Sequence, residues 1–514
     1  MIKHVFVVML ENRSFDHMLG LSNITGTDAV TGKPTTIDGL NNTNNSNPDL
    51  HSNKVVVSAP ADWTMLYDPG HSFADVKEQL CGRRGNYPAI NNSGFVTRYS
   101  LLDPNHPSEI MKCFSPNQLP VLTTLAEEFA VCDRWFSSVP GPTWPNRFFV
   151  HAASSGGLDD SPNTFTIASF TFNGYKFDNG TIFDRLDAEG IGWKIYAGDE
   201  FPQVLSISGM PFNAFTGHFS DFNDFSRDVS NPGYSPGYTF IEPNYGHTFT
   251  YGRDFACGTS QHPKDDVTRG DRLLKNIYEA IRNSPHWENS VLVIMYDEHG
   301  GFYDHVHPPT TVAPGDSITD PENNHNNFDF KQLGVRVPAV IVSPLIPKGM
   351  IDHTVYDHTS VLATLENIFG LQALTNRDKH ANTFKHLFSL TTPRTDAPKT
   401  LPEPAHSGII CEGDVAAASG TGAAAGAIGS AIGAGASSAV LRPDPAHAVV
   451  PVDPSLSGFV HVAFLQDMHL SPPQEKEQQT AKFLSIQTNA DAQQYMDEVR
   501  QKVNTYKATM GTKE

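Results

Sequence analysis

Three largely apolar stretches predict buried strands. They cover Val5–Leu10, Val291–Tyr296 and Val335–Ser343, and each is rich in β-branched residues. An apolar run without alternation suits a strand that is covered on both faces, as in a parallel sheet between two layers of helices. The three stretches therefore predict the centre of an α/β domain.

Apolar residues at helical spacing predict helices between these strands. The clearest examples are Asp271–Asn283, which precedes the second strand, and Thr359–Phe369. A chain that alternates strands and helices is typical of an α/β fold with a mostly parallel sheet. Long stretches rich in Asn, Gly and Pro, such as Asp38–Pro48 and Asn213–Tyr238, predict surface loops that could build a site.

The composition changes after about residue 400, which divides the chain into a catalytic domain (1–400) and a C-terminal region (401–514). Val415–Leu441 has no charged residue and consists mainly of Ala, Gly and Ser. This segment predicts a flexible linker or surface loop, with a lipid-touching segment as the rival interpretation. Gln474–Tyr506 is polar and predicts one long helix or two short ones.

The net charge and the cysteines exclude several classes of function. The 514-residue chain carries a formal net charge of −20, which disfavours a nucleic-acid partner and electrostatic binding to anionic lipid. A zwitterionic or neutral lipid headgroup remains compatible. The five cysteines are scattered without a CxxC pair, which argues against a cysteine-based zinc site. An odd number leaves at least one free thiol and allows one disulfide.

The N-terminus carries no visible secretory signal. Met1 leads directly into the first predicted strand, and charged residues follow that strand without a cleavage-site pattern. We therefore expect a cytoplasmic location as encoded, export by a non-standard route, or a leader that has been removed.

Polar pairs follow two of the predicted strands. Glu11 and Asn12 come after the first strand, and Asp297 and Glu298 come after the second. Because active sites in open α/β sheets lie at the carboxyl ends of strands, we expect the two pairs to meet. Their oxygen atoms are hard ligands for a divalent cation. The alternative for either pair is a strand-end loop with solvated charges.

Thr143 is the candidate nucleophile. It follows Pro142 and lies two residues before Pro145, so the fixed backbone angles would hold its hydroxyl still, while Arg147 could pair with a phosphate or a carboxylate. A metal-bound threonine alkoxide is an activated nucleophile. The alternative is that Thr143 caps a helix, a role compatible with catalysis because a helix N-terminus also stabilises an anion.

Three longer motifs resemble a known family. ENRSFDH at 11–17, PTWPNR at 142–147 and DEHGGFYDHV at 297–306 resemble the phosphoesterase family of bacterial and plant non-specific phospholipases C and related bacterial acid phosphatases. The resemblance covers about residues 1 to 390. Shorter matches are DPGH at 68–71, GHF at 217–219, EPNY at 242–245, and HP at 262–263 before DDV at 265–267.

The resemblance implies an alkaline phosphatase-like fold and assigns roles to individual residues. Thr143 would be both the nucleophile and a metal ligand. Three histidines and Asn12 would contact the substrate phosphate, and one histidine would protonate the leaving alkoxide. The implied ligands are Glu11, Asn12, Thr143, Asp297 and Glu298, and the implied histidines are His71, His218 and His262.

The remaining motif residues have supporting roles in this interpretation. We expect His299, Asp304 and His305 to fix the loop or orient the ligands rather than to take part in catalysis. Arg13 and Asp16 are expected to pair within their own loop.

The predicted function is metal-dependent hydrolysis of a phosphate ester through a phosphothreonine. The favoured reaction is that of a phospholipase C, a phosphoric diester hydrolase that converts phosphatidylcholine-like lipids to diacylglycerol and a phosphorylated headgroup. One alternative is an acid phosphatase acting on small monoesters. An alternative of another class is a membrane- or partner-binding effector module with the C-terminal region as adaptor. The oxygen ligands favour Ca²⁺ or Mg²⁺, and Zn²⁺ or Mn²⁺ would also bind carboxylates.

Overall fold

The computed structural model describes residues 2–40, 45–162, 174–213, 217–246, 255–316, 323–411, 452 and 454–510. A ten-stranded sheet lies at the centre of this part of the chain, in the order β3-β2-β12-β6-β11-β10-β1-β9-β7-β8. The strands are β1 (His4–Leu10), β2 (Thr25–Asp28), β3 (Pro34–Thr36), β6 (Ala130–Cys132), β7 (Trp193–Ala197), β8 (Phe219–Asp221), β9 (Tyr238–Glu242), β10 (Ser290–Tyr296), β11 (Ala339–Val342) and β12 (Met350–Asp352). A separate hairpin joins β4 (Ser46–Pro48) to β5 (Lys54–Val56).

The central strands are the ones that the apolar pattern predicts. β1 and β10 are buried along their whole length and pair in parallel, with Leu10 opposite Tyr296. β9 pairs in parallel on the other side of β1. Because both faces of these strands are covered, their sequences need no polar alternation.

The third predicted strand is shorter than expected and runs in the opposite direction. Only Ala339–Val342 of the stretch Val335–Ser343 forms a strand, β11. Pro338 immediately precedes it and has no N–H to donate to a neighbouring strand. β11 is antiparallel to both β10 and β6. Six of the nine neighbouring strand pairs are parallel, so the predicted mostly parallel sheet is confirmed.

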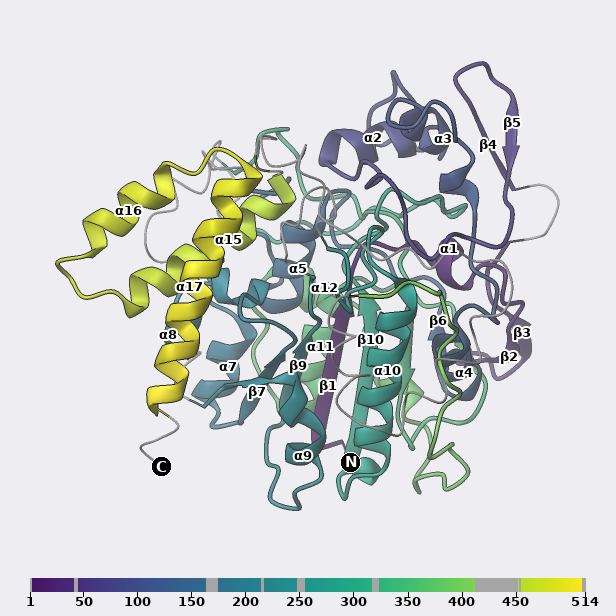
Figure 1. The fold of residues 1–514 in the computed structure, drawn as a ribbon. Helices are drawn as coiled ribbons and strands as arrows, with labels where there is room; N and C mark the ends of the chain where they lie inside the picture. The colour runs from purple at the N-terminus through teal and green to yellow at the C-terminus, as the bar shows by residue number, and fades with distance from the viewer. Residues whose placement is uncertain are drawn as a thin grey trace, which may run out of the picture.

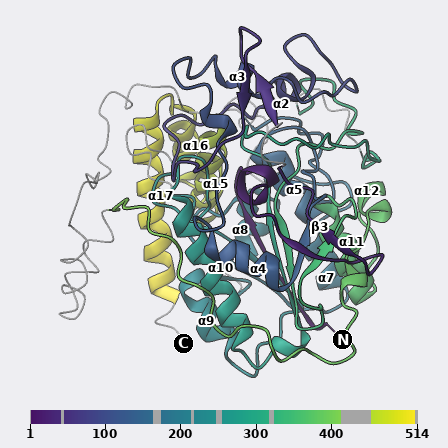
Figure 2. The same ribbon diagram turned by 90° about the vertical axis from the view of Figure 1, so that its right-hand side faces the viewer.

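Helices cover both faces of the sheet (Figures 1 and 2). One layer contains α4 (Pro120–Glu128), α9 (Phe225–Val229) and α10 (Val267–Arg282), and the other contains α5 (Thr143–Ala152), α7 (Ile182–Ala188), α11 (Thr359–Phe369) and α12 (Asn376–His380). α11 has the predicted bounds. α10 begins four residues before its predicted start, because Asp266 caps it by accepting a hydrogen bond from the Thr268 N–H. The predicted α/β class is confirmed.

The shorter elements surround the carboxyl ends of the central strands or lie beside the sheet. α2 (Phe73–Cys81), α3 (Phe95–Tyr99) and the β4–β5 hairpin lie above those strand ends in Figure 1, and α1 (Phe15–Leu19) follows β1. The expectation of a plain loop over Asn213–Tyr238 is wrong, because this stretch contains β8 and α9. Residues 41–44 of the other expected loop lie outside the described residues, and β4 occupies its end.

The C-terminal region contributes three helices that pack on the body of the protein. They are α15 (Pro454–Leu470), α16 (Lys476–Leu484) and α17 (Asn489–Met510), so the helices predicted for Gln474–Tyr506 are confirmed. Phe459, Val462 and Phe464 of α15 belong to the main hydrophobic core, and α15 contacts α5 and α8 (Met210–Asn213). The predicted Ala- and Gly-rich segment 415–441 lies outside the described residues.

The packing of α15 bears on the proposed membrane adaptor. Its described side chains from Ser457 to Met468 are all buried within the protein, so they present no free apolar face to a lipid surface. Among the described helices, none combines the length and the hydrophobicity that crossing a bilayer requires. The contacts of this region therefore lend no support to an adaptor role.

Candidate active site

The paired strands β1 and β10 bring the two predicted polar pairs together. The Asn12 N–H donates to Asp297 Oδ1 at 2.9 Å, and the Arg13 N–H donates to the Glu298 carbonyl at 2.9 Å. The Glu298 N–H also donates to Asp297 Oδ1, at 2.6 Å. Asn12 has a φ of +58°, a left-handed conformation that Asn tolerates better than most residues and that turns the chain sharply after the strand. The predicted meeting of the strand ends is therefore observed.

Thr143 lies at the first position of α5 and faces Asn12. Its hydroxyl donates to Asn12 Oδ1 at 3.0 Å. Asn146 fixes the preceding loop, because its side chain accepts from the Val139 N–H and donates to the Gly141 and Pro142 carbonyls. The helix cap is Pro142, and the Thr143 side chain points to the predicted metal ligands instead of capping the helix. The N-terminus of α5, which is the positive end of the helix dipole, thus lies beside this hydroxyl.

Arg147 connects α5, the helix that begins at Thr143, to the carboxyl ends of β1 and β10. Its Nε donates to Asp297 Oδ2 at 3.1 Å, and its Nη2 donates to the carbonyls of Met9 and Leu10 at 3.2 Å each. Both members of the ion pair are buried. The carboxylate partner that the sequence suggested for Arg147 is therefore Asp297.

The three carboxylates at the strand ends, Glu11, Asp297 and Glu298, are buried with too little positive charge beside them to neutralise all three. Glu11 Oε2 and Glu298 Oε1 are buried and have no hydrogen-bond partner among the described residues. Burial raises the pKa of Glu11 well above its ordinary value, and the charges of Asp297 and Glu298 raise it further against the effect of Arg147. Burial likewise raises the pKa of Asp297 to about 6. Buried carboxylate oxygens without a partner in the described part of the chain, beside the Asn12 and Thr143 side chains, are of the kind that a hard divalent cation prefers, and the metal site itself stays a prediction.

Two of the three predicted histidines flank Asp68. His71 Nδ1 lies 4.0 Å from Asp68 Oδ1, and His262 Nε2 lies 3.4 Å from Asp68 Oδ2. Burial lowers the pKa of His71, but the charges of Glu298 and Asp68 outweigh it and raise the pKa to about 10. Burial dominates at His262 and lowers its pKa. The structure thus places one strongly basic and one weakly basic imidazole near the carboxylate cluster.

The prediction for His218 is wrong. Its Nδ1 contacts the Trp193 carbonyl at 3.2 Å, and its ring stacks on the Trp193 indole with centroids 3.9 Å apart. Trp193 begins β7 and is level with Tyr238 and Val5 at the starts of β9 and β1. The six residue-to-residue steps from Val5 to Glu11, which follows β1, span roughly 20 Å at ~3.3 Å each. His218 therefore lies at the amino ends of the strands, away from the site.

The loop after β10 supports Glu298. His299 Nδ1 lies 3.3 Å from Glu298 Oε2, and its Nε2 lies 2.8 Å from Gln79 Oε1. The Gly300 N–H donates to Glu298 Oε2 at 2.7 Å. His299 thus orients a carboxylate, in agreement with its expected supporting role.

Arg13 and Asp16 do not pair with each other, contrary to expectation. Arg13 donates to the carbonyls of Gln261 and His262 at 2.7 and 3.1 Å, and so holds the His262 loop. Asp16 instead pairs with Arg336 Nη2 at 2.8 Å. Arg336 lies in the chain before β11, 320 residues after Asp16, so no local pattern reveals this partner.

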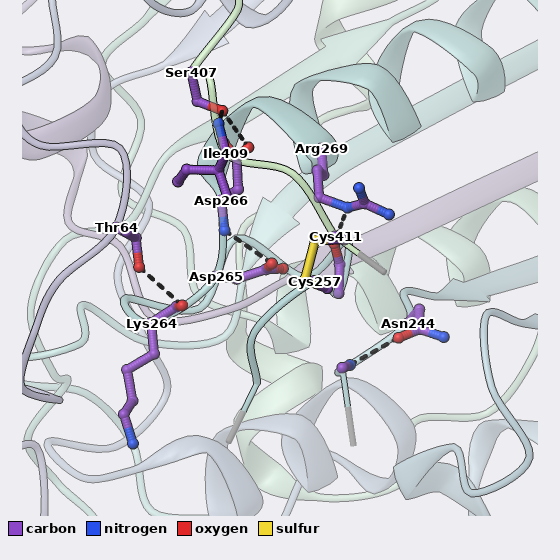
Figure 3. The surroundings of a disulfide bond; sticks show 12 residues. Thr64, Asn244, Cys257, Lys264, Asp265, Asp266, Arg269, Ser407, Ile409 and Cys411 are labelled. Carbon is purple, nitrogen blue, oxygen red and sulfur yellow. Dashed lines mark hydrogen bonds between the residues drawn. A yellow bond between two sulfur atoms is a disulfide. The ribbon is translucent and has the colours of Figure 1, made fainter. Parts of the chain in front are cut away.

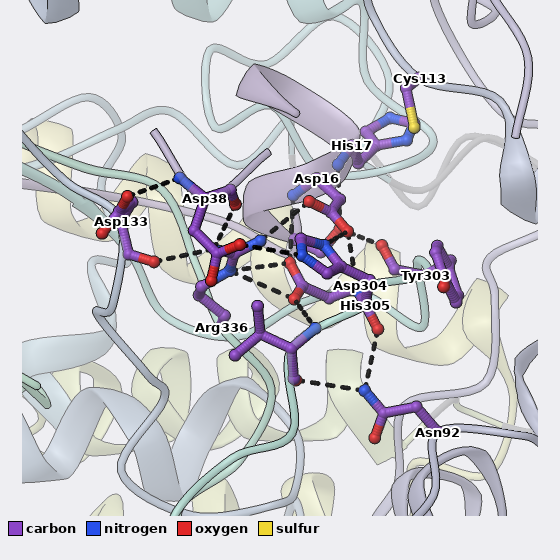
Figure 4. Close-up of polar contacts among 12 residues, drawn as sticks. Asp16, His17, Asp38, Asn92, Cys113, Asp133, Tyr303, Asp304, His305 and Arg336 are labelled. Carbon is purple, nitrogen blue, oxygen red and sulfur yellow. Dashed lines mark hydrogen bonds and ion pairs between the residues drawn. The ribbon is translucent and has the colours of Figure 1, made fainter. Parts of the chain in front are cut away.

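A second acidic cluster surrounds Arg336 (Figure 4). Arg336 Nε lies 3.2 Å from both Asp304 carboxylate oxygens, and His305 Nδ1 lies 2.7 Å from Asp16 Oδ2. Asp16, Asp304 and His305 are close enough together to hold a metal ion. However, the buried guanidinium already supplies their positive charge, so we interpret this cluster as an ion-pair network that fixes two loops.

Sequence reasoning missed several residues that support the site. Ser260 accepts a backbone hydrogen bond from Glu11 at 2.9 Å and hydrogen-bonds its carboxylate through the side chain. Tyr245 places its ring 5.1 Å from the Arg147 guanidinium, and Phe255 stacks on His262 at 3.8 Å. Asp68 lies within the DPGH match and could have been noticed, whereas Ser260 and Phe255 carry no sequence signal.

One disulfide anchors the loop that carries His262 (Figure 3). Cys257 is bonded to Cys411, and their Cα atoms are 5.9 Å apart. Next to it, the Ser407 hydroxyl donates to Asp266 Oδ2 at 2.5 Å. The other three cysteines, Cys81, Cys113 and Cys132, are buried free thiols. One disulfide, which the cysteine count allows, is therefore present, and three thiols are free.

Comparison with known proteins gives a consistent set of relatives. The model of the Phosphoesterase family matches residues 2–372. Non-specific phospholipase C6 of Arabidopsis thaliana is 39% identical over 416 residues, covering 78% of this chain and 75% of that protein. Non-specific phospholipase C3 of the same plant is 36% identical over 426 residues, covering 78% of this chain and 76% of that protein. Phospholipase C B of Mycobacterium tuberculosis (strain CDC 1551 / Oshkosh) is 26% identical over 444 residues, covering 78% of this chain and 80% of that protein.

Solved structures resemble the chain only weakly. An alkaline phosphatase superfamily protein from Vibrio parahaemolyticus has 14% identity and a TM-score of 0.30, covering 52% of this chain and 65% of that one. The lipoteichoic acid synthase LtaP from Listeria monocytogenes has 11% identity and a TM-score of 0.31, covering 73% of both chains. Similarity at this level supports no conclusion about function.

Proposed function

Because this chain belongs to the phosphoesterase family, we propose that it is a metal-dependent phospholipase C with Thr143 as its nucleophile. The observation that carries the proposal is the Thr143 hydroxyl on Asn12 Oδ1, beside buried carboxylate oxygens that have no hydrogen-bond partner among the described residues. This arrangement joins a fixed nucleophile to a set of hard oxygen ligands. The names of the relatives supply the reaction class.

In the first step, the Thr143 oxygen attacks phosphorus and the bond from phosphorus to the glycerol oxygen breaks. His71 or His262 gives a proton to the leaving alkoxide, and the proton lost from Thr143 replaces it. The positive end of the α5 dipole, at Thr143, stabilises the negative charge that grows on the phosphate oxygens. Diacylglycerol leaves, and a phosphothreonine that still carries the headgroup remains.

In the second step, water attacks the phosphothreonine. A proton from the water restores the Thr143 hydroxyl, and the phosphorylated headgroup is released. A divalent cation held by Glu11, Asn12, Thr143, Asp297 and Glu298 would neutralise phosphate charge and favour the alkoxide form of Thr143. Arg147 holds Asp297 in place through their buried ion pair.

Exposed apolar residues next to the site favour a lipid over a small monoester. Leu66 and Tyr67 are 76% and 42% exposed and directly precede Asp68. The Met65 N–H donates to the Pro263 carbonyl at 2.7 Å, which holds this segment beside His262. Apolar side chains at the edge of a site suit a substrate presented in an aggregate or a membrane.

Thr143→Ala tests the proposal. We expect it to lower kcat by a factor of about 10⁴ or more on mixed phosphatidylcholine micelles, because the covalent step is lost. Thr143→Ser is expected to retain most of the activity, since it keeps the hydroxyl. His218→Ala is the matched control, because this histidine lies at the opposite end of the strands.

The product and the metal requirement are measured in the same assay. Diacylglycerol and phosphocholine are the expected products, and a chelator is expected to abolish their formation until a divalent cation is restored. Near-normal turnover by Thr143→Ala, or full activity of metal-free protein, would rule out the mechanism. Release of phosphate from monoesters with no action on lipid would favour the acid phosphatase.

A further inference from the structure

The C-terminal helix α15 lies directly behind the candidate active site. It is outside residues 2–372, to which the family model applies. Phe459 of this helix is almost completely buried. Its ring centroid lies 5.3 Å from that of Trp144, 5.1 Å from that of Tyr245 and 6.4 Å from that of Phe255.

Each of these three aromatic residues holds a different part of the site. Trp144 follows Thr143 at the start of α5. The Tyr245 ring lies 5.1 Å from the guanidinium of Arg147, which pairs with Asp297. The Phe255 ring stacks on His262 with centroids 3.8 Å apart. A single side chain of the C-terminal region therefore packs behind the nucleophile, the arginine and a histidine.

The residues around Phe459 seat α15 closely on α5. A Cβ atom at Gly458 would overlap the indole ring of Trp144, so the two helices approach more closely than another residue would allow. The Ser457 hydroxyl donates to the Pro162 carbonyl at 2.6 Å, which ties α15 to the chain after α5. The Cys257–Cys411 disulfide anchors the Phe255 loop independently, two residues from Phe255.

We infer that Phe459 is a positioning residue for the reaction, and that α15 is part of the catalytic structure rather than an appendage to it. The inference rests on the proposed function. Interior packing leaves little free space, so loss of the Phe459 ring frees Trp144, Tyr245 and Phe255 to shift together. A displacement of about 1 Å at a reacting group can lower the rate by a factor of about 100.

The experiment compares Phe459→Ala with Phe464→Ala in the full chain. Phe464 lies on the same helix and is also buried, but its ring stacks on Phe483 of α16 at 4.3 Å, away from the site. Both variants remove one core aromatic ring and are expected to lower the melting temperature. Only Phe459→Ala is expected to lower kcat, by about 10-fold or more, with KM changed less than about 2-fold.

Two further variants keep the test valid if Phe459→Ala folds poorly. Phe459→Leu refills most of the space and is expected to recover most of kcat. Gly458→Ala favours the helical conformation of α15 but pushes it against Trp144, so kcat is expected to fall although helix propensity improves. A loss of kcat in Gly458→Ala therefore cannot come from a weakened helix.

The outcomes separate this inference from the proposed function. Equal losses of kcat in Phe459→Ala and Phe464→Ala would overturn the inference, because α15 would then act only through stability. Wild-type kcat in Phe459→Ala, together with inactive Thr143→Ala, would also overturn it and leave the proposed function standing. Full activity of Thr143→Ala would instead refute the proposed nucleophile.

Discussion

Opening the Cys257–Cys411 disulfide is expected to destabilise the protein by an amount that follows from the spacing of the two residues. They are 154 residues apart in sequence. A cross-link that closes a loop of this length lowers the entropy of the unfolded chain enough to stabilise the fold by ~5 kcal/mol. The unfolding entropy of a 514-residue chain is about 1 kcal/mol per kelvin near its melting temperature. Loss of the bond therefore predicts a melting temperature lower by about 5 °C.

The measurement is thermal unfolding of the wild type with and without reductant, beside a Cys257→Ser/Cys411→Ser variant. The variant is expected to melt with the reduced wild type and to be insensitive to reductant, because the remaining three cysteines are free thiols. Thiol titration under denaturing conditions verifies that reduction is complete. Fully reduced wild type that melts at the same temperature as the oxidised protein would refute the loop-entropy reasoning.

Two further predictions concern buried charges. Burial, together with the carboxylate of Asp378, raises the pKa of Glu366 to about 9. Because this folded-state pKa lies above the unfolded value, the group costs stability as the pH rises from about 4.5 toward 9. Glu366→Gln should therefore raise the melting temperature at pH 8 and leave it unchanged at pH 4; an equal effect at both values would contradict this. Arg336→Met leaves the buried carboxylates of Asp16 and Asp304 without their guanidinium, and should lower the free energy of unfolding in urea by about 3–5 kcal/mol. A loss below about 1 kcal/mol would indicate that the network contributes little.

The central strands and the candidate metal ligands could be predicted because their signals are local. The apolar runs that form β1 and β10 are continuous, and each ends in a pair of polar residues that the paired strands carry to one point. Thr143 could be chosen as the candidate nucleophile because Pro142 and Pro145 fix the backbone around it. The general rule that active sites lie at the carboxyl ends of strands predicted where the two polar pairs meet.

His218 could not be placed in the same way. The match around it covers three residues, and nothing in those residues reports which end of a strand they occupy. The pairing of β7 with β8 and β9 places it at the amino ends of the strands. The direction of β11 could not be predicted either. An apolar run has the same pattern in both directions, so only the pairing with β10 and β6 fixes the orientation of the strand.

The sequence by itself determined the α/β class, the strand ends that carry the candidate oxygen ligands and the choice of Thr143 as the candidate nucleophile. Each of these follows from residues that are adjacent in the chain. The tertiary structure alone decided which charges are neutralised and what supports the site. Arg336 reaches Asp16 across 320 residues, and Phe459 reaches Trp144 from a region that the catalytic motifs do not include. Such contacts depend on packing between distant segments, and the local pattern of neither segment encodes the other.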